Sequence, residues 1–293
     1  MTLRRLSSMR DTARLHLSGT VLGLLASGGR AFAEGTGEGH AVPGQMGFQR
    51  GTTEIAHDIH WFHDWLLLPI ITIICLFVLG LLVWVVLKFN ENAHPVPSRT
   101  THNSLLEVAW TIVPVLILVV IAIPSFRLLT KQLVLPDADM TMKVTGKQWY
   151  WTYEYPQDQG GGFSFDSLLK PDSDLKAGDI RLLAVDNEAV VPIGKTVRVQ
   201  VTAADVIHSF VVQSFGARID AVPGRLNETW FKAEKEGVYY GQCSKICGKD
   251  HAFMPIAFRV VSEQDYAAWL ADAKKKFASN STPVAVAAAE TAH

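Results

Sequence analysis

The stretch that decides the fold is Tyr-Tyr-Gly-Gln-Cys-Ser-Lys-Ile-Cys-Gly-Lys-Asp-His-Ala-Phe-Met, residues 239–254. It brings four soft ligands together at steps of four, four and three residues: Cys243, Cys247, His251 and Met254. Thiolate, imidazole and thioether favour copper over magnesium, calcium or manganese. Two thiolates on one loop can bridge two copper ions, and a further imidazole must then come from elsewhere. His208, which ends a valine-rich strand before a turn, is the candidate.

Two other chemistries are open to this cysteine pair. A disulfide fits a segment that faces an oxidising compartment, but it leaves the His and the Met without a role. Zinc also binds Cys and His, whereas a thioether is a poor zinc ligand. The loop therefore predicts copper. Cys75, in an apolar helix, is expected to be inert packing.

Composition points to a membrane anchor rather than to a large soluble core. Of the 293 residues, 48% are hydrophobic and 19% are charged, and the net charge is -1. A chain this neutral gives no electrostatic case for nucleic acid, so no nucleic-acid partner is expected. The apolar excess is concentrated in two stretches.

The N-terminus has the pattern of a secretory signal over residues 1–33. A basic start and a short apolar run precede Ala31-Phe32-Ala33, which is an A-x-A cleavage site. The alternative is a cytoplasmic tail. After cleavage, residues 34–60 would form a flexible periplasmic arm.

Residues 61–131 predict a transmembrane hairpin with spans at about 66–87 and 105–126. No charged residue occurs in 66–87, and about twenty apolar residues cross a bilayer as a helix. The second span is expected to end near Pro124 and to kink at Pro114, where a backbone hydrogen bond is lost. The signal peptide places the mature N-terminus and the C-terminal domain on the outer side.

Residues 135–262 predict an all-β domain, and residues 263–293 a closing helix and a low-complexity tail. Strands are expected at 141–145, 148–155, 180–185, 196–202, 208–213, 229–233, 237–242 and 256–261. Many short strands with regular turns predict a sandwich or barrel. With the metal loop between its last two strands, the pattern resembles a cupredoxin-like Greek-key sandwich that follows a two-helix transmembrane hairpin.

The loop closely resembles the dinuclear CuA loop of subunit II of haem-copper cytochrome c oxidases, and the likeness covers most of the mature chain. It includes Gly-Lys-Gln-Trp-Tyr-Trp-Thr-Tyr-Glu-Tyr at 146–155, Phe-Asp-Ser at 165–167, Val-Asp-Asn at 185–187 and Asp-Ala-Val-Pro-Gly-Arg-Leu-Asn at 220–227. The resemblance implies that Cys243 and Cys247 bridge the coppers and that His208 and His251 are terminal ligands. It implies weak axial ligands from Met254 and the backbone carbonyl of Lys245.

Lys245 departs from the family, which usually has Glu there. A backbone carbonyl ligand survives that change. The family's carboxylate also helps to hold a magnesium ion at the interface with subunit I, and magnesium needs oxygen ligands. Magnesium binding is therefore in doubt for this chain.

The resemblance also implies a function and a setting. The chain would accept electrons from cytochrome c and pass them to the haem of subunit I, which reduces O2 to water and pumps protons. Cytochrome c, subunit I, subunit III and membrane lipids are the implied partners. The implied location is a bacterial inner membrane, crossed more than once, with the mature N-terminus and the CuA domain in the periplasm.

Further residues take roles from the same resemblance. Trp149 is implied as the residue through which electrons enter, and Glu107 as lying near the entrance of a proton path of subunit I. The alternative for Glu107 is a helix N-terminal acid stabilised by the macrodipole. Cytochrome c is basic, so carboxylates should steer its docking. The candidates are Glu154, Asp166, Asp186 and Asp205.

Three other functions compete with an oxidase subunit II. A quinol oxidase subunit has the fold but lacks the copper ligands that are present here. A nitrous oxide reductase domain has the loop but no preceding membrane hairpin. A membrane-anchored copper chaperone or thiol-exchange protein would use Cys-x-x-x-Cys early in a βαβ unit, whereas here it follows a run of strands and has a Met partner. The prediction is the oxidase subunit.

Overall fold

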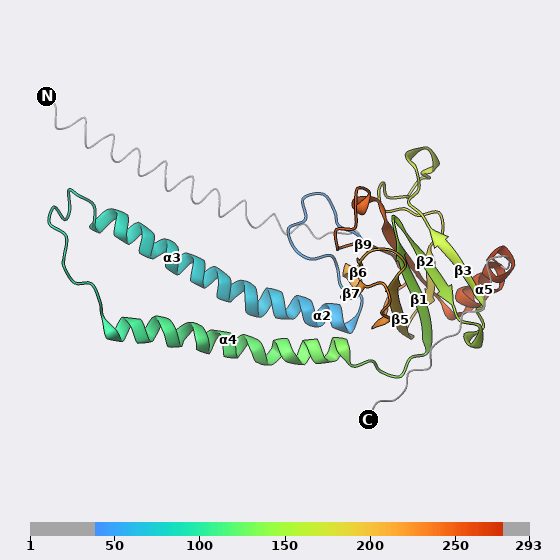
Figure 1. The fold of residues 1–293 in the computed structure, drawn as a ribbon, viewed down its shortest axis with the longest axis horizontal. Helices are drawn as coiled ribbons and strands as arrows, with labels where there is room; N and C mark the ends of the chain where they lie inside the picture. Colours follow the sequence, from blue (N-terminus) through green and yellow to red (C-terminus); the bar gives the residue numbers. More distant parts are fainter. Residues whose placement is uncertain (1–38, 278–293) are drawn as a thin grey trace. The chain divides into compact units, whose positions relative to one another are not determined.

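The computed structural model describes residues 39–277 and divides them at Arg50. Residues 39–50 are the described part of a first unit and consist of turns and irregular chain. The second unit carries two long helical segments, a β-sandwich and a closing helix (Figure 1). The signal peptide predicted at 1–33 and the tail after residue 277 lie outside the described residues.

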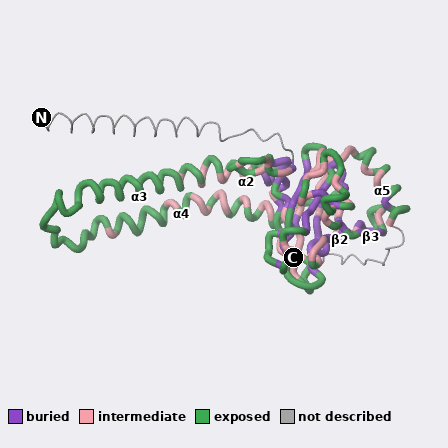
Figure 2. The backbone as a smooth tube through the Cα atoms, turned by 90° about the horizontal axis from the view of Figure 1, so that it is seen from above, coloured by how far each residue is buried: buried purple, intermediate pink, exposed green. Residues whose placement is uncertain are grey.

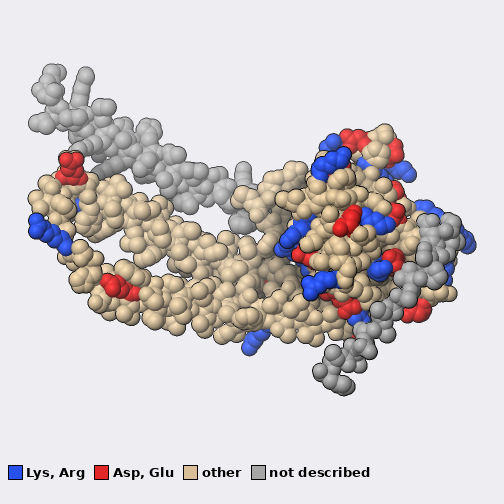
Figure 3. All heavy atoms as spheres, viewed as in Figure 1, with Lys and Arg blue, Asp and Glu red and all other residues tan. Residues whose placement is uncertain are grey.

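The two predicted spans are confirmed as apolar helices. Helix α2 (Glu54–Trp61), the π-helical η1 (Phe62–Leu67) and α3 (Leu68–Lys88) form one run of 35 residues, and α4 (Ser104–Leu133) has 30. Helices α3 and α4 contain no buried residue, and the backbone along them is coloured as exposed or intermediate (Figure 2). Charged side chains gather on the sandwich, while the long helices are almost bare of them (Figure 3). Helices that are apolar all round need an apolar solvent.

Helix α4 does not end near Pro124, as the sequence predicted, but continues to Leu133. A proline removes its own N–H from the helix, and contacts beyond it hold the last two turns in place. The Lys131 ammonium bonds Glu54 at 2.6 Å and Asp58 at 2.5 Å, both in α2. The Lys131 carbonyl accepts a hydrogen bond from the Trp230 indole at 3.2 Å.

The segment predicted as a flexible arm over 34–60 is ordered in its last part, because α2 begins at Glu54. Thr53 caps this helix by accepting the Ala56 N–H, and its hydroxyl donates to the Phe215 carbonyl at 2.8 Å. Ile55 and Ala56 are buried. A capped helix start with two buried apolar residues is fixed against the sandwich.

The sandwich has two five-stranded sheets, which confirms the predicted fold class. The first has the order β3 (Phe163–Ser167), β2 (Tyr150–Tyr155), β1 (Met140–Lys147), β5 (Thr196–Ala203) and β8 (Asn227–Lys232). The second has the order β4 (Ala189–Pro192), β10 (Pro255–Val261), β9 (Gly237–Cys243), β6 (His208–Val212) and β7 (Ala217–Ala221). Pairs β1–β5 and β4–β10 are parallel and the others antiparallel. Helix α5 (Glu263–Phe277) closes the described chain.

Aromatic side chains fill the space between the sheets. On β2, Trp151, Tyr153 and Tyr155 are buried, as expected for packing residues. Phe258 of β10 meets Phe210 at a ring-centroid distance of 5.9 Å. Burying one such side chain contributes about 1.5–3 kcal/mol, so this core gives the strands that carry the predicted metal ligands a rigid support.

The predicted strand at 180–185 is wrong. Leu182 has a φ of 68° there, which a pleated strand does not allow, and only Val185 makes an isolated bridge, to Leu169. Three short strands were not predicted: β3, β4 and β7. The strand predicted at 148–155 begins only at Tyr150, which leaves residues 148 and 149 as a turn between β1 and β2.

Candidate metal centre

Sheet pairing places the loop of residues 244–254 beside the start of β6. Strands β9 and β10 are antiparallel, with Pro255 opposite Gln242, so the two ends of the loop lie side by side. Strand β6 also pairs with β9, with Phe210 opposite Cys243. His208, two residues before Phe210, is therefore brought to Cys243 although 35 positions separate them.

The candidate ligand atoms converge in one buried cluster. The sulfur of Cys243 lies 4.0 Å from that of Cys247 and 3.9 Å from Nδ1 of His208. The sulfur of Cys247 lies 3.5 Å from Nδ1 of His251 and 3.5 Å from Sδ of Met254. His208 is 0% exposed, and the two cysteines are 7% and 5% exposed. Among the described residues, His208, Cys243 and Cys247 are the one group of three His, Cys, Asp or Glu whose ligand atoms converge.

This donor set fits copper better than the alternatives. A metal–thiolate bond is about 2.3 Å long for zinc, so sulfurs 4.0 Å apart can both contact one ion. They are about twice an S–S bond length apart, and both cysteines are free. The buried Met254 thioether adds a soft ligand beside Cys247, which suits copper and not zinc.

The carbonyl of Lys245 also points into the cluster. It lies 3.3 Å from the Cys243 sulfur, so the backbone of residue 245 is available as a ligand whatever its side chain. Magnesium requires several oxygen ligands, and position 245 offers one carbonyl and an ammonium group. This chain therefore fits copper at the loop and provides less for magnesium beside it.

The two thiols have opposed pKa shifts. Burial raises the pKa of Cys243, but hydrogen bonds to His208 and to backbone groups outweigh burial and lower this pKa to about 7. Burial and the nearby charge of Cys243 raise the pKa of Cys247 to about 12. Two sulfurs this close cannot both ionise easily, so a bound cation is needed to hold both as thiolates.

Two glycines make room for the cluster. A Cβ on Gly146 of β1 would lie 2.9 Å from Cδ2 of His208, which is closer than side chains approach one another. Gly248 has a φ of +128°, and a Cβ there would lie 2.8 Å from the Trp149 ring. Both positions need glycine, the second also for its backbone conformation.

The turn between β1 and β2 holds the backbone of the metal loop. The Gln148 side chain donates to the Cys247 carbonyl at 2.7 Å, and the Trp149 indole N–H donates to the same carbonyl at 3.3 Å. Trp149 is half-buried, and the Lys249 ammonium lies 5.6 Å from its ring centroid. Trp149 is thus one hydrogen bond from the main chain of a cysteine ligand. Sequence reasoning missed Gln148, for which the Gly-Lys-Gln-Trp motif was the available signal.

Each of the four predicted docking acids has a local partner in the structure. Glu154 pairs with Lys143 at 3.0 Å, and Asp166 accepts a hydrogen bond from the Thr152 hydroxyl at 2.6 Å. Asp186 accepts the Leu168 N–H at 2.7 Å. Asp205 alone lies at the metal cluster, 2.9 Å from Nε2 of His208. The cluster thus gains a carboxylate that the sequence did not place there.

Glu107 lies in the first turn of α4, away from the metal cluster in the fold. Asn103 caps the helix by accepting the N–H groups of Leu105 and Leu106. One carboxylate oxygen of Glu107 is 3.3 Å from the Asn103 N–H. This geometry matches a helix N-terminal acid, and the proton-path role stays a prediction.

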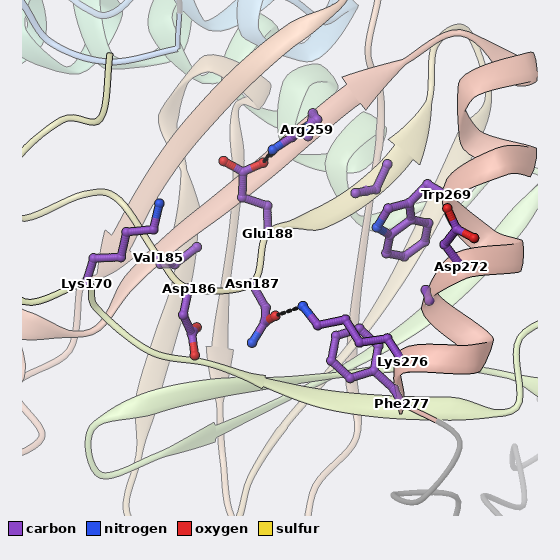
Figure 4. A pocket seen from close by; sticks show the side chains of 12 residues that line it. Lys170, Val185, Asp186, Asn187, Glu188, Arg259, Trp269, Asp272, Lys276 and Phe277 are labelled. Carbon is purple, nitrogen blue, oxygen red and sulfur yellow. Dashed lines mark hydrogen bonds and ion pairs between the residues drawn. The ribbon is translucent and has the colours of Figure 1, made fainter. Parts of the chain in front are cut away.

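A cavity of about 350 Å³ lies elsewhere, between α5 and the segment that leads into β4 (Figure 4). The pairs Glu188–Arg259 and Asn187–Lys276 span it. None of the candidate metal ligands lines this cavity. It is therefore not part of the metal centre.

Comparison with known proteins agrees with this arrangement. The family "Cytochrome C oxidase subunit II, transmembrane domain" matches residues 41–128, and the family "Cytochrome C oxidase subunit II, periplasmic domain" matches residues 140–261. A probable cytochrome c oxidase subunit 2 of Rickettsia bellii is 51% identical over 261 residues, which cover 89% of this chain and 94% of that protein. Cytochrome c oxidase subunit 2 of Cereibacter sphaeroides is 48% identical over 269 residues, with coverages of 86% and 88%.

A solved structure is also similar: the crystal structure of the periplasmic domain of subunit II of cytochrome oxidase of Bradyrhizobium japonicum. It is 60% identical and covers 49% of this chain and 99% of that chain, with a TM-score of 0.45. The two family matches place the apolar helices in a membrane domain and the sandwich in a periplasmic domain. The chain belongs to the cytochrome c oxidase subunit II family and is thus a subunit of a haem-copper oxidase, an oxidoreductase complex.

Proposed function

We propose that this chain is the electron-accepting subunit of its oxidase, with a dinuclear CuA centre held by Cys243, Cys247, His208, His251 and Met254. The observation that carries the proposal is the convergence of two free thiols, two imidazole Nδ1 atoms and a thioether in one buried cluster. A copper pair bound there would take up one electron and pass it on. The chain's own residues hold the ligand atoms in place and exclude water.

Rigidity is the main contribution of the protein to this function. His208 and Cys243 lie in paired strands, and the sandwich core fixes both. Ligands on rigid elements move little when the charge of a bound metal changes, so little reorganisation accompanies electron transfer. The carbonyl of Lys245, 3.3 Å from the Cys243 sulfur, would complete the proposed set.

Trp149 is proposed as the residue through which electrons enter from cytochrome c. It is half-buried rather than packed in the core, and its indole N–H bonds the Cys247 carbonyl at 3.3 Å. An aromatic ring in that position lies between solvent and the metal cluster. The haem of subunit I would then receive the electron, and O2 reduction and proton pumping would follow in that subunit.

The setting is proposed from the same family. Cytochrome c, subunit I, subunit III and membrane lipids are the proposed partners, with the mature N-terminus and the copper domain in the periplasm of a bacterial inner membrane. Glu107 is proposed to lie near the proton-path entrance of subunit I. Magnesium at the subunit interface is expected to be weakly held, because Lys245 supplies no carboxylate.

Thiol exchange is the competing function, and accessibility argues against it. A thiol that attacks a partner's disulfide must be reachable as a thiolate. Cys243 and Cys247 are 7% and 5% exposed. The low pKa of Cys243 therefore serves ligation better than exchange.

Metal analysis of the full-length chain in detergent tests the copper proposal. We expect two copper ions per chain and a purple colour, because two bridging thiolates give intense charge-transfer absorption. Cys243→Ser should abolish the colour, whereas Cys75→Ser, which changes a thiol in α3, should leave it intact. A stoichiometry of one copper, or displacement of copper by zinc in competition, would contradict the dinuclear centre.

Electron entry is tested on the assembled oxidase with Trp149→Ala. Oxidation of reduced cytochrome c should slow, while the copper absorption stays as in the wild type. An unchanged rate would show that Trp149 only packs against the loop.

A further inference from the structure

Asp205 occupies the turn between β5 and β6 and binds three donors at once. Its Oδ1 lies 2.9 Å from Nε2 of His208 and accepts the Val206 N–H at 2.6 Å. Its Oδ2 accepts the backbone N–H of Gln148 at 2.7 Å. A carboxylate engaged by both oxygens has a fixed orientation, and only 33% of this side chain is exposed.

The contact with Asp205 decides which nitrogen of His208 faces the cysteines. Because Nε2 points to the carboxylate, Nδ1 points to the Cys243 sulfur, 3.9 Å away. A neutral imidazole that donates its Nε2–H to a carboxylate keeps its lone pair on Nδ1. Such a partner also makes the ligating nitrogen more basic and fixes the plane of the ring.

The two imidazoles of the cluster are not equivalent in this respect. Within residues 39–277, the ring of His251 contacts the Cys247 sulfur through Nδ1, and no carboxylate is bonded to its other nitrogen. His208 is fully buried, whereas His251 is partly exposed. The carboxylate therefore supports one ligand selectively.

The second oxygen of Asp205 extends this support to the other side of the cluster. It holds the main chain of Gln148, whose side chain donates to the Cys247 carbonyl at 2.7 Å. One carboxylate thus connects His208, from β6, with the turn that holds the backbone of Cys247.

We propose that Asp205 is a positioning residue of the copper centre. It sets the tautomer and ring plane of His208 and ties the Gln148–Trp149 turn to the same anchor. The inference deepens the proposed function and rests on it, because the ligand that Asp205 orients has a purpose only if the cluster binds copper.

The test compares copper(I) affinity across four full-length chains in detergent, measured by competition with a chromophoric copper(I) chelator. They are the wild type, Asp205→Ala, Asp205→Asn and Asp158→Asn. Asp158 is an exposed acid of η2 (Gln157–Gln159), after the far end of β2, so its variant removes one negative charge away from the cluster. Asp205→Asn keeps the size of the side chain and one acceptor oxygen, which guards against simple misfolding.

We expect Asp205→Ala to bind copper about 10- to 100-fold more weakly, as is typical when the carboxylate behind a ligating imidazole is lost. Asp205→Asn should show a smaller loss, and Asp158→Asn should match the wild type. In the assembled oxidase, the KM for cytochrome c at several ionic strengths separates this role from docking, because a docking role alone would change the salt dependence and leave copper affinity unchanged.

Two results would overturn the inference, and they are distinguishable. If the wild type binds copper and both Asp205 variants bind it equally tightly, Asp205 does not position a ligand; a weaker salt dependence in those variants would then assign it to docking. If the wild type itself binds no copper, the proposed function fails and the inference with it.

Discussion

At the scale of single residues, the surroundings of Cys243 and Cys247 shift the pKa values of two identical thiols in opposite directions. Hydrogen bonds lower the pKa of Cys243 to about 7, while burial and the charge of Cys243 raise the pKa of Cys247 to about 12. Above about pH 8 the metal-free loop therefore holds one thiolate, on Cys243. Copper must displace the second proton when it binds.

This difference predicts a pH dependence of copper binding. Protons compete with the metal at any ligand whose pKa lies above the pH, so affinity falls as pH falls. Between about pH 8 and 10, Cys247 is the one of the two thiols that is still protonated, and its proton should make apparent affinity change about tenfold per pH unit. Below the pKa of Cys243, about 7, a second thiol proton joins and the slope should steepen. Chelator competition from pH 6 to 10 measures it, and a flat profile would contradict the raised pKa of Cys247.

The candidate metal ligands could be predicted from the sequence, but the residues that support them could not. Cys243, Cys247, His251 and Met254 lie within one loop, so their spacing alone indicates a shared metal. The sequence analysis predicts Asp205 as a docking acid because cytochrome c is basic and carboxylates should steer its association. Its contact with His208 depends on the exact path of that turn, and its contact with Gln148 depends on where β2 begins.

At the scale of elements, strand β1 approaches the candidate ligand His208 more closely than a side chain on β1 would allow. A Cβ at Gly146 would lie 2.9 Å from Cδ2 and 3.1 Å from Cγ of His208. The neighbour is the ring itself rather than the end of a flexible chain. Strand β1 also lies in the sheet opposite to that of β6, so the glycine sets the distance between the sheets at the cluster.

Gly146→Ala should therefore displace the His208 ring and weaken copper binding, by about tenfold or more if the ring loses its contact with Asp205. The strand should still form, because alanine is tolerated in the extended conformation. Copper affinity reports the displacement of the His208 ring, and the thermal unfolding midpoint of the metal-free chain reports whether the strand still forms. Gly80→Ala, at a helix position with open space around it, is the matched control and should change neither. If Gly146→Ala binds copper as tightly as the wild type, β1 can shift to accommodate the methyl group without moving the His208 ring.

Helices and strands were predicted correctly where the pattern of apolar residues was long. The prediction failed where pairing with a neighbouring strand decides whether a strand forms. Helix α5 was predicted over the residues that form it, and β5, β9 and β10 have the expected positions. Strand β3 is short and half polar, and it exists because it pairs with β2 along five residues. Residues 180–185 are apolar enough for a strand, but the left-handed backbone at Leu182 ends any pleat there.

At the scale of the whole molecule, hydrogen bonds and ion pairs join the membrane helices to the sandwich. Lys131 at the end of α4 is bonded to Glu54 and Asp58 of α2, and its carbonyl to Trp230 of β8. Thr52 donates its backbone N–H to the Ser214 carbonyl at 2.9 Å. Between the end of α4 and the start of β1, residues 134–139 are the connection from the helices to the sandwich.

The continuation of α4 from Pro124 to Leu133 sets how far the chain travels along the helix axis before the sandwich begins, and through what angle it rotates about that axis. At about 1.5 Å and 100° per residue, these nine positions advance the chain about 14 Å along the helix axis and fix the direction in which it leaves the helix. One alanine inserted after Leu128 should leave copper binding intact. It should rotate the sandwich about the α4 axis by about 100° and so slow the proposed electron delivery to the haem of subunit I. Haem reduction by cytochrome c in the assembled oxidase measures this. An alanine inserted in the exposed turn at 176–179 is the control. Full activity with the α4 insertion would mean that the docking of subunits, not helix length, sets where electrons leave this chain.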